Sequence, residues 1–165
     1  MARAVLRLLL RETLLSRPRT PAQAQGADEL INYTTGDLKA FLKERHPDGV
    51  DVVFDPVGGA VTEAALRGIA WGGRHLVIGF ASGEIPRIPL NLPLLKGCQI
   101  VGVFWGDFTR REPAEAARQL AILAGWAREG RIRPLVSQRF PLAEAHLALN
   151  AVAARRAVGK IVVLP

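Results

Sequence analysis

Two glycine-bearing turns carry the residues best suited to holding a ligand, and each follows a short apolar run. The first turn, Asp55-Pro56-Val57-Gly58-Gly59, follows the β-branched run Val50–Phe54, and the second turn, Gly79-Phe80-Ala81-Ser82-Gly83, follows Leu76-Val77-Ile78. Ligands of open parallel sheets bind beyond the carboxyl ends of the strands. Glycine lets the backbone approach such a ligand closely. The pattern therefore predicts a cofactor-binding edge at these two turns.

Other kinds of site chemistry have little support in the sequence. His46, His75 and His146 are far apart and lack metal-ligand spacing, which favours structural roles for them. The lone cysteine, Cys98, excludes an internal disulfide and a four-cysteine zinc site, and its apolar surroundings favour a buried structural thiol. No motif supports a Ser/His/Asp or Cys/His arrangement. We therefore predict no catalytic side chain and no metal ligand.

The elements that must position the two turns form a strand–helix–strand unit. The run Val50–Phe54 is almost continuously apolar, which is typical of a parallel strand buried on both faces. Apolar residues then recur at helical spacing from Val61 up to Trp71. Gly72-Gly73 ends that helix, and Leu76–Ile78 is the second strand. Such a crossover is almost always right-handed, so the carboxyl ends of both strands share one edge of the sheet.

The rest of the chain continues the alternation of strands and helices, which predicts an α/β layer fold. We expect a brief strand at 26–33, a helix at Asp37–Arg45, an extended proline-containing segment at 84–93, a strand at Gln99–Phe104, a helix from Pro113 to Gly130, a strand at Leu135–Phe140, a helix from Pro141, and a last strand at Lys160–Leu164. The helix from Pro113 is expected to bury Ala116, Leu120, Leu123 and Ala127. The helix from Pro141 is expected to bury Leu142, Ala145, His146, Leu149 and Val152.

Composition and charge separate the first 25 residues from the rest. The chain has 165 residues, 49% hydrophobic and 22% charged, which is typical of a soluble globular protein. Five arginines against one glutamate leave +4 of the net +7 in residues 1–25. Arg3, Arg7 and Arg11 share one helical face, which indicates either a mitochondrial transit peptide or an unrelated leader. The expected location is cytoplasmic, with mitochondrial as the alternative. No apolar run reaches the roughly 18 residues of a membrane span.

Six stretches in order resemble the C-terminal part of the medium-chain dehydrogenase/reductase superfamily, in its zinc-free, zeta-crystallin-like quinone oxidoreductase branch. They are GADELINY (26–33), GVDVVFDPVGG (49–59), GGRHLVIGFASG (72–83), IPLNLPLLKG (88–97), IVGVFWGDF (100–108) and RRAVGKIVVL (155–164). The resemblance implies a partial Rossmann-type parallel sheet with flanking helices, lacking the first two strands and the glycine-rich phosphate loop. It implies a leader at 1–25, a partial nucleotide-binding domain at 26–131, and at 132–165 a helix and strands that in the family return to the substrate domain.

The same resemblance implies that NADPH is the cofactor and assigns residues to its parts. Tyr33 matches a tyrosine near the 2′-phosphate, and the first turn passes the adenosine ribose. The stretch 78–83 lies beside the nicotinamide, as do Phe104 and Trp105 at the family's dimer edge. Arg155, or its neighbour Arg156, reaches the phosphates. The implied cofactor-binding residues are Tyr33, Asp55, Pro56, Val57, Gly58, Gly59, Ile78, Gly79, Phe80, Ala81, Ser82, Gly83, Phe104, Trp105 and Arg155.

Three functions follow as alternatives. The first is metal-free hydride transfer from NADPH to a quinone or activated alkene, as the resemblance implies. The second is a non-catalytic fragment that dimerises with itself or with a full-length relative through the strand near Val101–Phe104. It is favoured because the sequence has no counterpart of the family's substrate domain or phosphate loop, so we expect weak NADPH binding, an open sheet edge and unpartnered terminal strands. The third, nucleic-acid binding, is disfavoured because over half of the excess charge lies in residues 1–25.

Overall fold

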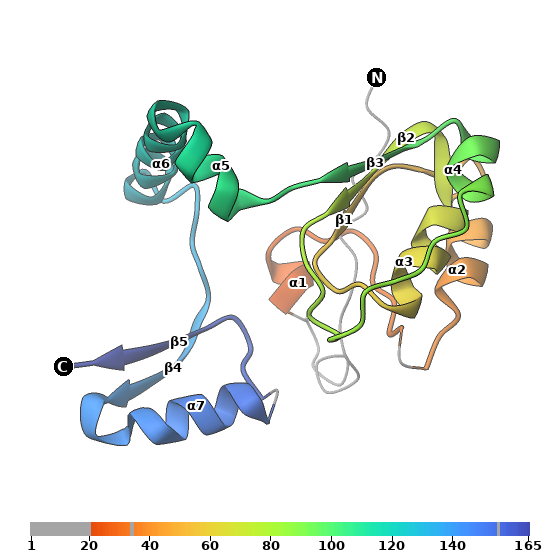
Figure 1. The fold of residues 1–165 in the computed structure, drawn as a ribbon. Helices are drawn as coiled ribbons and strands as arrows, with labels where there is room; N and C mark the ends of the chain where they lie inside the picture. The colour runs from red at the N-terminus through yellow and green to blue at the C-terminus, as the bar shows by residue number, and fades with distance from the viewer. Residues whose placement is uncertain (1–20, 34, 155) are drawn as a thin grey trace. The chain divides into compact units, whose positions relative to one another are not determined.

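A computed structural model describes residues 21–33, 35–154 and 156–165 of the chain. The described residues form two compact units, one that ends at Phe104 and one that runs from Trp105 to Pro165 (Figure 1). Most of the expected leader, residues 1–20, lies outside the described residues. The predicted domain boundary at 131/132 stays a prediction, since it concerns the domains of longer relatives. In this structure the division into compact units falls after Phe104.

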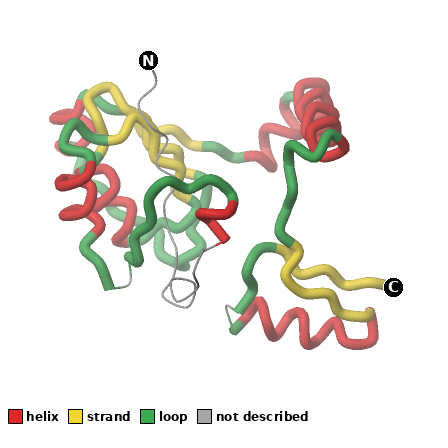
Figure 2. Tube along the Cα trace, turned by 180° about the vertical axis from the view of Figure 1, so that it is seen from behind, coloured by secondary structure: helices red, strands yellow, loops and turns green. Residues whose placement is uncertain are grey.

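The first unit is built on a three-stranded parallel sheet in the order β1-β2-β3. Its elements are α1 (Pro21–Ala24), α2 (Leu38–Arg45), β1 (Val50–Asp55), α3 (Ala60–Arg67), β2 (Ile69–Val77), α4 (Asn91–Lys96) and β3 (Gln99–Gly102). The helices α2, α3 and α4 lie on the same side of the sheet in both views (Figures 1 and 2). The predicted strand–helix–strand unit around the two turns is confirmed, as is the α/β class of the fold.

Strand register decides which side chains face α3. Asp55 pairs with Val77, and His75 pairs with Ile100 on β3. Because side chains alternate along a strand, Asp55, His75 and Ile100 point to one face. Helix α3 contacts both β1 and β2, so this face is the covered one. On the other face, Phe54 keeps 64% of its surface exposed.

The core of the first unit lies where α2 and α3 meet the start of β1. It consists of Ile31, Leu38, Leu42, Val50 and Ala65. Helix α2 begins at an Asp37 cap, whose Oδ1 accepts the backbone N–H of Ala40 at 3.0 Å. A Cβ on Gly68 would lie 2.6 Å from Leu42 Cδ1, so glycine allows α2 and the end of α3 to approach this closely.

The second unit contains two helices followed by a small strand–helix–strand arrangement. Its elements are α5 (Trp105–Arg111), α6 (Pro113–Arg128), β4 (Val136–Pro141), the 3₁₀ turn η2 (Leu142–Glu144), α7 (Ala145–Ala153) and β5 (Lys160–Leu164). Strands β4 and β5 pair with each other in parallel, and α7 packs on both (Figure 1). The expectation that these two strands lack partners is therefore wrong.

Three of the expected elements differ from the structure. Residues 26–33 form no strand, and Ile31 contributes to the core from an irregular segment. The helix expected up to Trp71 ends at Arg67, and β2 begins at Ile69. Ile69 matches helical spacing, but its backbone pairs with Val50 of β1. The third strand ends at Gly102, and Trp105 begins a helix, α5, that the sequence did not predict.

The burial predicted for the helices of the second unit is also wrong in part. On α6 Ala116 is buried, whereas Leu120 is 54% exposed. On α7 the buried residues are Ala148 and Ala151, whereas Leu149 is 71% exposed. The exposed members of the predicted stripes are Leu120, Leu123, Ala127, Leu142, His146, Leu149 and Val152. Cys98 is half-buried rather than fully buried.

Candidate functional site

The two turns lie side by side at the carboxyl ends of β1 and β2, as predicted. Backbone hydrogen bonds connect them directly, from Ala81 N–H to the Pro56 carbonyl at 3.0 Å and from Ser82 N–H to the Val57 carbonyl at 2.9 Å. A further bond, from Ile78 N–H to the Asp55 carbonyl at 2.9 Å, continues the strand pairing into the turns. The turns are thus one rigid structural unit at the edge of the sheet.

Glycine is required where the first turn meets the second. Gly58 has φ of +73°, a conformation that side chains disfavour. A Cβ there would also lie 2.7 Å from Phe80 Cδ1. In contrast, a Cβ on Gly79 would meet only the Pro56 carbonyl oxygen, at 3.6 Å, and one on Gly83 would meet nothing within 4 Å. The backbone of the second turn is therefore open to a close approach by a ligand.

Asp55 holds the first turn in place through both carboxylate oxygens. It is 6% exposed. Its Oδ1 accepts the backbone N–H groups of Val57 and Gly58, each at 2.9 Å. Its Oδ2 accepts the hydroxyl of Thr62 at 2.5 Å and lies 3.2 Å from Nε2 of His75. A carboxylate offers about four acceptor positions, so Asp55 is fully satisfied inside the protein.

These contacts keep Asp55 ionised. Burial alone would raise the pKa of Asp55, but the hydrogen bonds from His75 and Thr62 oppose it. With the two backbone donors they hold that pKa well below its ordinary value of 3.8. Because an ionised carboxylate only accepts hydrogen bonds, we assign a proton to Nε2 of His75, which donates to Asp55.

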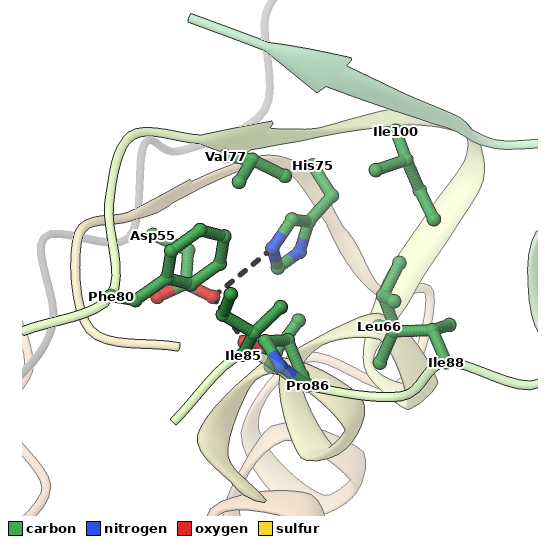
Figure 3. A pocket seen from close by; sticks show the side chains of 10 residues that line it. Asp55, Leu66, His75, Val77, Phe80, Ile85, Pro86, Ile88 and Ile100 are labelled. Carbon is green, nitrogen blue, oxygen red and sulfur yellow. Dashed lines mark hydrogen bonds and ion pairs between the residues drawn. The ribbon is translucent and has the colours of Figure 1, made fainter. Parts of the chain in front are cut away.

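A pocket of about 230 Å³ lies beside this pair, between the sheet and α3. It is lined by Asp55, Thr62, Leu66, His75, Val77, Phe80, Ile85, Pro86, Ile88 and Ile100. In Figure 3 the imidazole of His75 stands in the middle of these side chains, with one nitrogen turned toward Asp55. The other nitrogen, Nδ1, is buried and has no hydrogen-bond partner among the described residues. The pocket therefore presents one unpaired polar atom within mainly apolar walls.

The other residues implied for cofactor binding are spread over the chain. Tyr33 is half-buried in the segment before α2. Phe104 ends the first unit and is 73% exposed, whereas Trp105 begins α5 in the second unit, with its ring 5.4 Å from that of Phe108. Arg155 lies outside the described residues. A common site that contains these residues and the two turns stays a prediction.

Sequence reasoning missed the partnership of Asp55 with Thr62 and His75. A signal existed, because His75 is the only imidazole in a run that otherwise reads as a buried strand. It also lies two residues before Val77, which is the strand partner of Asp55. The expectation that His75 has a structural role agrees with its complete burial and its bond to Asp55.

Residues 21–33, 35–154 and 156–165 contain no group of three or more His, Cys, Asp or Glu side chains that could hold a metal ion. Within the same ranges, no helix combines the length and apolar character needed to cross a membrane.

The two turns fit part of a dinucleotide. The open backbone at Gly79 and Gly83 suits close approach of a flat ring or a ribose. A pyrophosphate, however, needs free N–H groups, which helix N-termini usually offer. In the turn that precedes α3, the N–H groups of Val57 and Gly58 donate to Asp55, and that of Gly59 donates to the Glu84 carbonyl at 3.1 Å. These three N–H groups of the first turn are therefore not available to a phosphate.

The parallel α/β fold and the paired glycine turns are features of nucleotide-dependent dehydrogenases. Residues 25–163 match the family model described as zinc-binding dehydrogenase. The chain belongs to this family, within the medium-chain dehydrogenase/reductase superfamily of oxidoreductases. The resemblance to that superfamily predicted from the sequence is thus confirmed.

Similar proteins of known sequence are oxidoreductases. Quinone oxidoreductase-like protein 2 of Bos taurus is 38% identical over 141 residues, which cover 85% of this chain and 40% of the relative. Prostaglandin reductase-3 of Mus musculus is 48% identical over 109 residues, which cover 60% of this chain and 29% of the relative. The chain thus spans about two fifths, or less, of the length of these two relatives.

Solved structures agree with the sequence relatives. A mycobacterial protein solved in complex with NADPH has a TM-score of 0.75 and 28% identity, covering 87% of this chain and 44% of that one. A probable oxidoreductase from Mycobacterium abscessus has a TM-score of 0.69 and 34% identity, covering 87% of this chain and 42% of that one. The fold expectation, a Rossmann-type sheet with flanking helices, is confirmed for the part of the chain that these structures cover.

Proposed function

We propose that this chain supplies part of the cofactor cleft of an NADPH-dependent oxidoreductase that reduces a quinone or an activated alkene. The observation that carries the proposal is the hydrogen-bonded pair of turns at the carboxyl ends of β1 and β2, with the backbone of Gly79 and Gly83 open. The names of the relatives support a quinone-type or enone-type substrate. The NADPH complex of a structural neighbour supports the choice of cofactor.

In this function the protein positions the cofactor, whose nicotinamide supplies the hydride. The second turn would border the nicotinamide, and the first turn would border the adenosine ribose. Asp55 keeps the first turn in shape through its bonds to Val57 and Gly58. No described side chain is assigned a proton-transfer role. The pyrophosphate needs donors other than the N–H groups of Val57, Gly58 and Gly59, since those groups are already bonded.

Calorimetric titration of the 165-residue chain with NADPH tests the proposal. Wild type is expected to bind weakly but saturably. Gly79→Val is expected to weaken binding by about tenfold or more, because the added side chain would occupy the open face of the second turn. Gly102→Val is the matched control, since a Cβ there meets nothing within 4 Å and Gly102 lies in β3, outside both turns. Equal loss in both variants, or no binding to a folded wild type, would contradict the proposal.

Turnover is tested separately with 1,4-benzoquinone as the electron acceptor. NADPH oxidation by the chain should exceed that of a boiled sample and should fall in Gly79→Val as binding falls. Binding without turnover would retain the cofactor assignment and remove the enzymatic one for the isolated chain.

A second candidate function, a dimerising fragment, is favoured by the position of β3. This strand lies at an edge of the sheet, and it is followed by Val103 and Phe104, which are 41% and 73% exposed. An unpaired edge of this kind is a template for pairing with another chain. Sedimentation analysis across a range of protein concentrations tests the idea. A Val101→Pro variant, which would disrupt β3 pairing, should shift a dimer to monomer, and a monomeric wild type would contradict it.

A further inference from the structure

The unpaired nitrogen of His75 is the feature of the first unit that its own fold does not explain. His75 is fully buried, with 0% of its surface exposed, and lines the 230 Å³ pocket. Buried polar atoms in proteins are nearly always hydrogen-bonded, and leaving one unpaired has an energetic cost. A group that enters the pocket and bonds Nδ1 would remove that cost.

The hydrogen bond on the other side of the ring determines what Nδ1 requires. Nε2 of His75 lies 3.2 Å from Oδ2 of the ionised Asp55 and donates its proton there. In the neutral imidazole the remaining nitrogen is then an acceptor. A matching ligand must bring an O–H or N–H donor to Nδ1.

The side chains that line the pocket indicate the polarity of the rest of the ligand. Besides His75, the polar lining residues are Asp55 and Thr62, and the Thr62 hydroxyl already donates to the Asp55 carboxylate. The other lining side chains are aliphatic, proline or phenylalanine. A buried water makes about three hydrogen bonds. A water beside Nδ1 would make one hydrogen bond, to Nδ1 itself, and its other sides would face apolar atoms. A molecule that is polar at one end and apolar elsewhere fits better.

We propose that the pocket binds a small, neutral aromatic molecule that carries one hydroxyl group, of the phenol class, with the O–H donating to Nδ1 of His75 and the ring lying against Leu66 and Phe80. A dry apolar cavity of about 150 Å³ accepts benzene, so a pocket of about 230 Å³ has room for a substituted single ring. An anion would be repelled by the carboxylate of Asp55 in the same wall. The pocket shares Asp55 and Phe80 with the two turns, whereas Gly79 and Gly83 do not line it, so the proposal does not rest on NADPH binding.

The rim of the pocket offers a way to close it without disturbing the core. Ile85 lines the pocket and yet is 71% exposed, so it lies at the entrance. Ile85→Trp would place a larger side chain there. Leu90→Trp is the matched control, because Leu90 belongs to the same loop-to-helix segment, is 81% exposed and does not line the pocket.

The test compares 4-methylphenol with 1,4-dimethylbenzene, which has the same shape with a methyl in place of the hydroxyl. Calorimetry on the full chain is expected to show saturable binding of the phenol, about tenfold tighter than that of the hydrocarbon. The ring ¹⁵N signals of His75 should shift with the phenol and not with the hydrocarbon. Equal affinities, or no binding of the phenol to a folded sample, would overturn the proposal.

Two variants locate the binding. His75→Phe should bring the two affinities to within about twofold of each other. Ile85→Trp should abolish binding of both probes, whereas Leu90→Trp should leave both unchanged. Should His75→Phe fail to fold, the two tryptophan variants and the ¹⁵N signals decide the matter. Phenol binding that survives Ile85→Trp would place it elsewhere and refute this site.

Discussion

Removing the carboxylate of Asp55 should destabilise the first unit more than any other single change of charge in it. Asp55→Ala leaves four donors without an acceptor, those of Val57, Gly58, Thr62 and His75. Three of these residues are buried, while Val57 is half-buried and can bond water. A hydrogen bond to a charged group contributes about 1.5–3 kcal/mol, and buried donors left unpaired are costly. We expect a loss of about 3–5 kcal/mol in the free energy of unfolding, near the upper end for single substitutions.

Asp55→Asn removes the negative charge of the side chain and keeps nearly the same shape, so it tests the contribution of the charge alone. Its oxygen can still accept the two backbone N–H groups. Its NH₂ group would face Thr62 and His75, but the hydroxyl can rotate to accept and the imidazole can move its proton to Nδ1. The expected loss is therefore smaller, about 1–2 kcal/mol. Asp51→Asn, on the same strand, is the control and should change stability by no more than about 0.5 kcal/mol.

Hydrogen exchange is the appropriate assay, because it reports stability segment by segment. Peptides that cover β1, the first turn and α3 should lose protection in Asp55→Ala, with a smaller loss in Asp55→Asn. Urea unfolding followed by circular dichroism provides the global value. If Asp55→Ala lost less than about 1 kcal/mol, or no more than Asp51→Asn, the carboxylate would not be organising the first turn and the reasoning would fail.

Three further predictions concern pH, backbone conformation and core packing. Because the pKa of Asp55 is depressed in the folded state, its carboxylate stabilises the fold fully above the ordinary pKa of 3.8, and this stabilisation is lost as the pH falls further. In urea unfolding, the difference in free energy of unfolding between wild type and Asp55→Asn should therefore shrink below pH 4. Gly49→Ala should cost about 3 kcal/mol or more in thermal or urea unfolding, because φ is +82° and the new Cβ would lie 2.5 Å from a backbone nitrogen of β2. Gly72→Ala, with φ of +72° and nothing within 4 Å, should cost only about 1–2 kcal/mol, and equal costs would contradict the clash. Leu66→Ala, at a site 1% exposed, should cost about 2–5 kcal/mol by urea unfolding, against less than about 0.5 kcal/mol for Leu95→Ala at a site 69% exposed.

The strand–helix–strand unit could be predicted from the sequence because its signals are local. The run Val50–Phe54 is apolar except at Asp51, and glycine-bearing turns follow both strands. The errors arose where a tertiary contact overrides the local pattern. Ile69 continues the helical spacing of Leu66, yet it pairs with Val50. Residues 26–33 have a strand-like composition, but Ile31 is used to fill the core without strand pairing.

The exposed leucines of α6 and α7 illustrate another limit of sequence periodicity. Apolar spacing identified both helices correctly, and it predicted Leu120 and Leu149 as buried. They are 54% and 71% exposed in the second unit. Periodicity shows which face of a helix is apolar. It does not show whether a neighbouring element in the same unit covers that face, since that depends on contacts distant in sequence.

The sequence marks His75 as an unusual residue in its stretch, but it does not identify Asp55 as the partner, because that pairing depends on an irregularity in strand pairing. Val50 pairs with Ile69, but two residues later Val52 pairs with Arg74, so β2 contains three additional residues over this stretch. Side chains alternate along a strand, and an odd number of additional residues moves each following side chain to the opposite face. Without them, Asp55 and His75 would point to opposite faces of the sheet.

The glycines of β2 make this irregularity feasible, and so connect the backbone of the strand to the chemistry of the pocket. Gly72 adopts φ of +72°, and a Cβ on Gly73 would lie 2.7 Å from Ile69 Cγ1. The sequence presents Gly72-Gly73 as the end of a helix, whereas in the structure the pair lies inside β2 and sets its register. That register places His75 beside Asp55, which fixes the proton on Nε2 and leaves Nδ1 as the acceptor in the pocket. The hydrogen-bonding character of the pocket thus originates in a backbone feature at the other end of the strand.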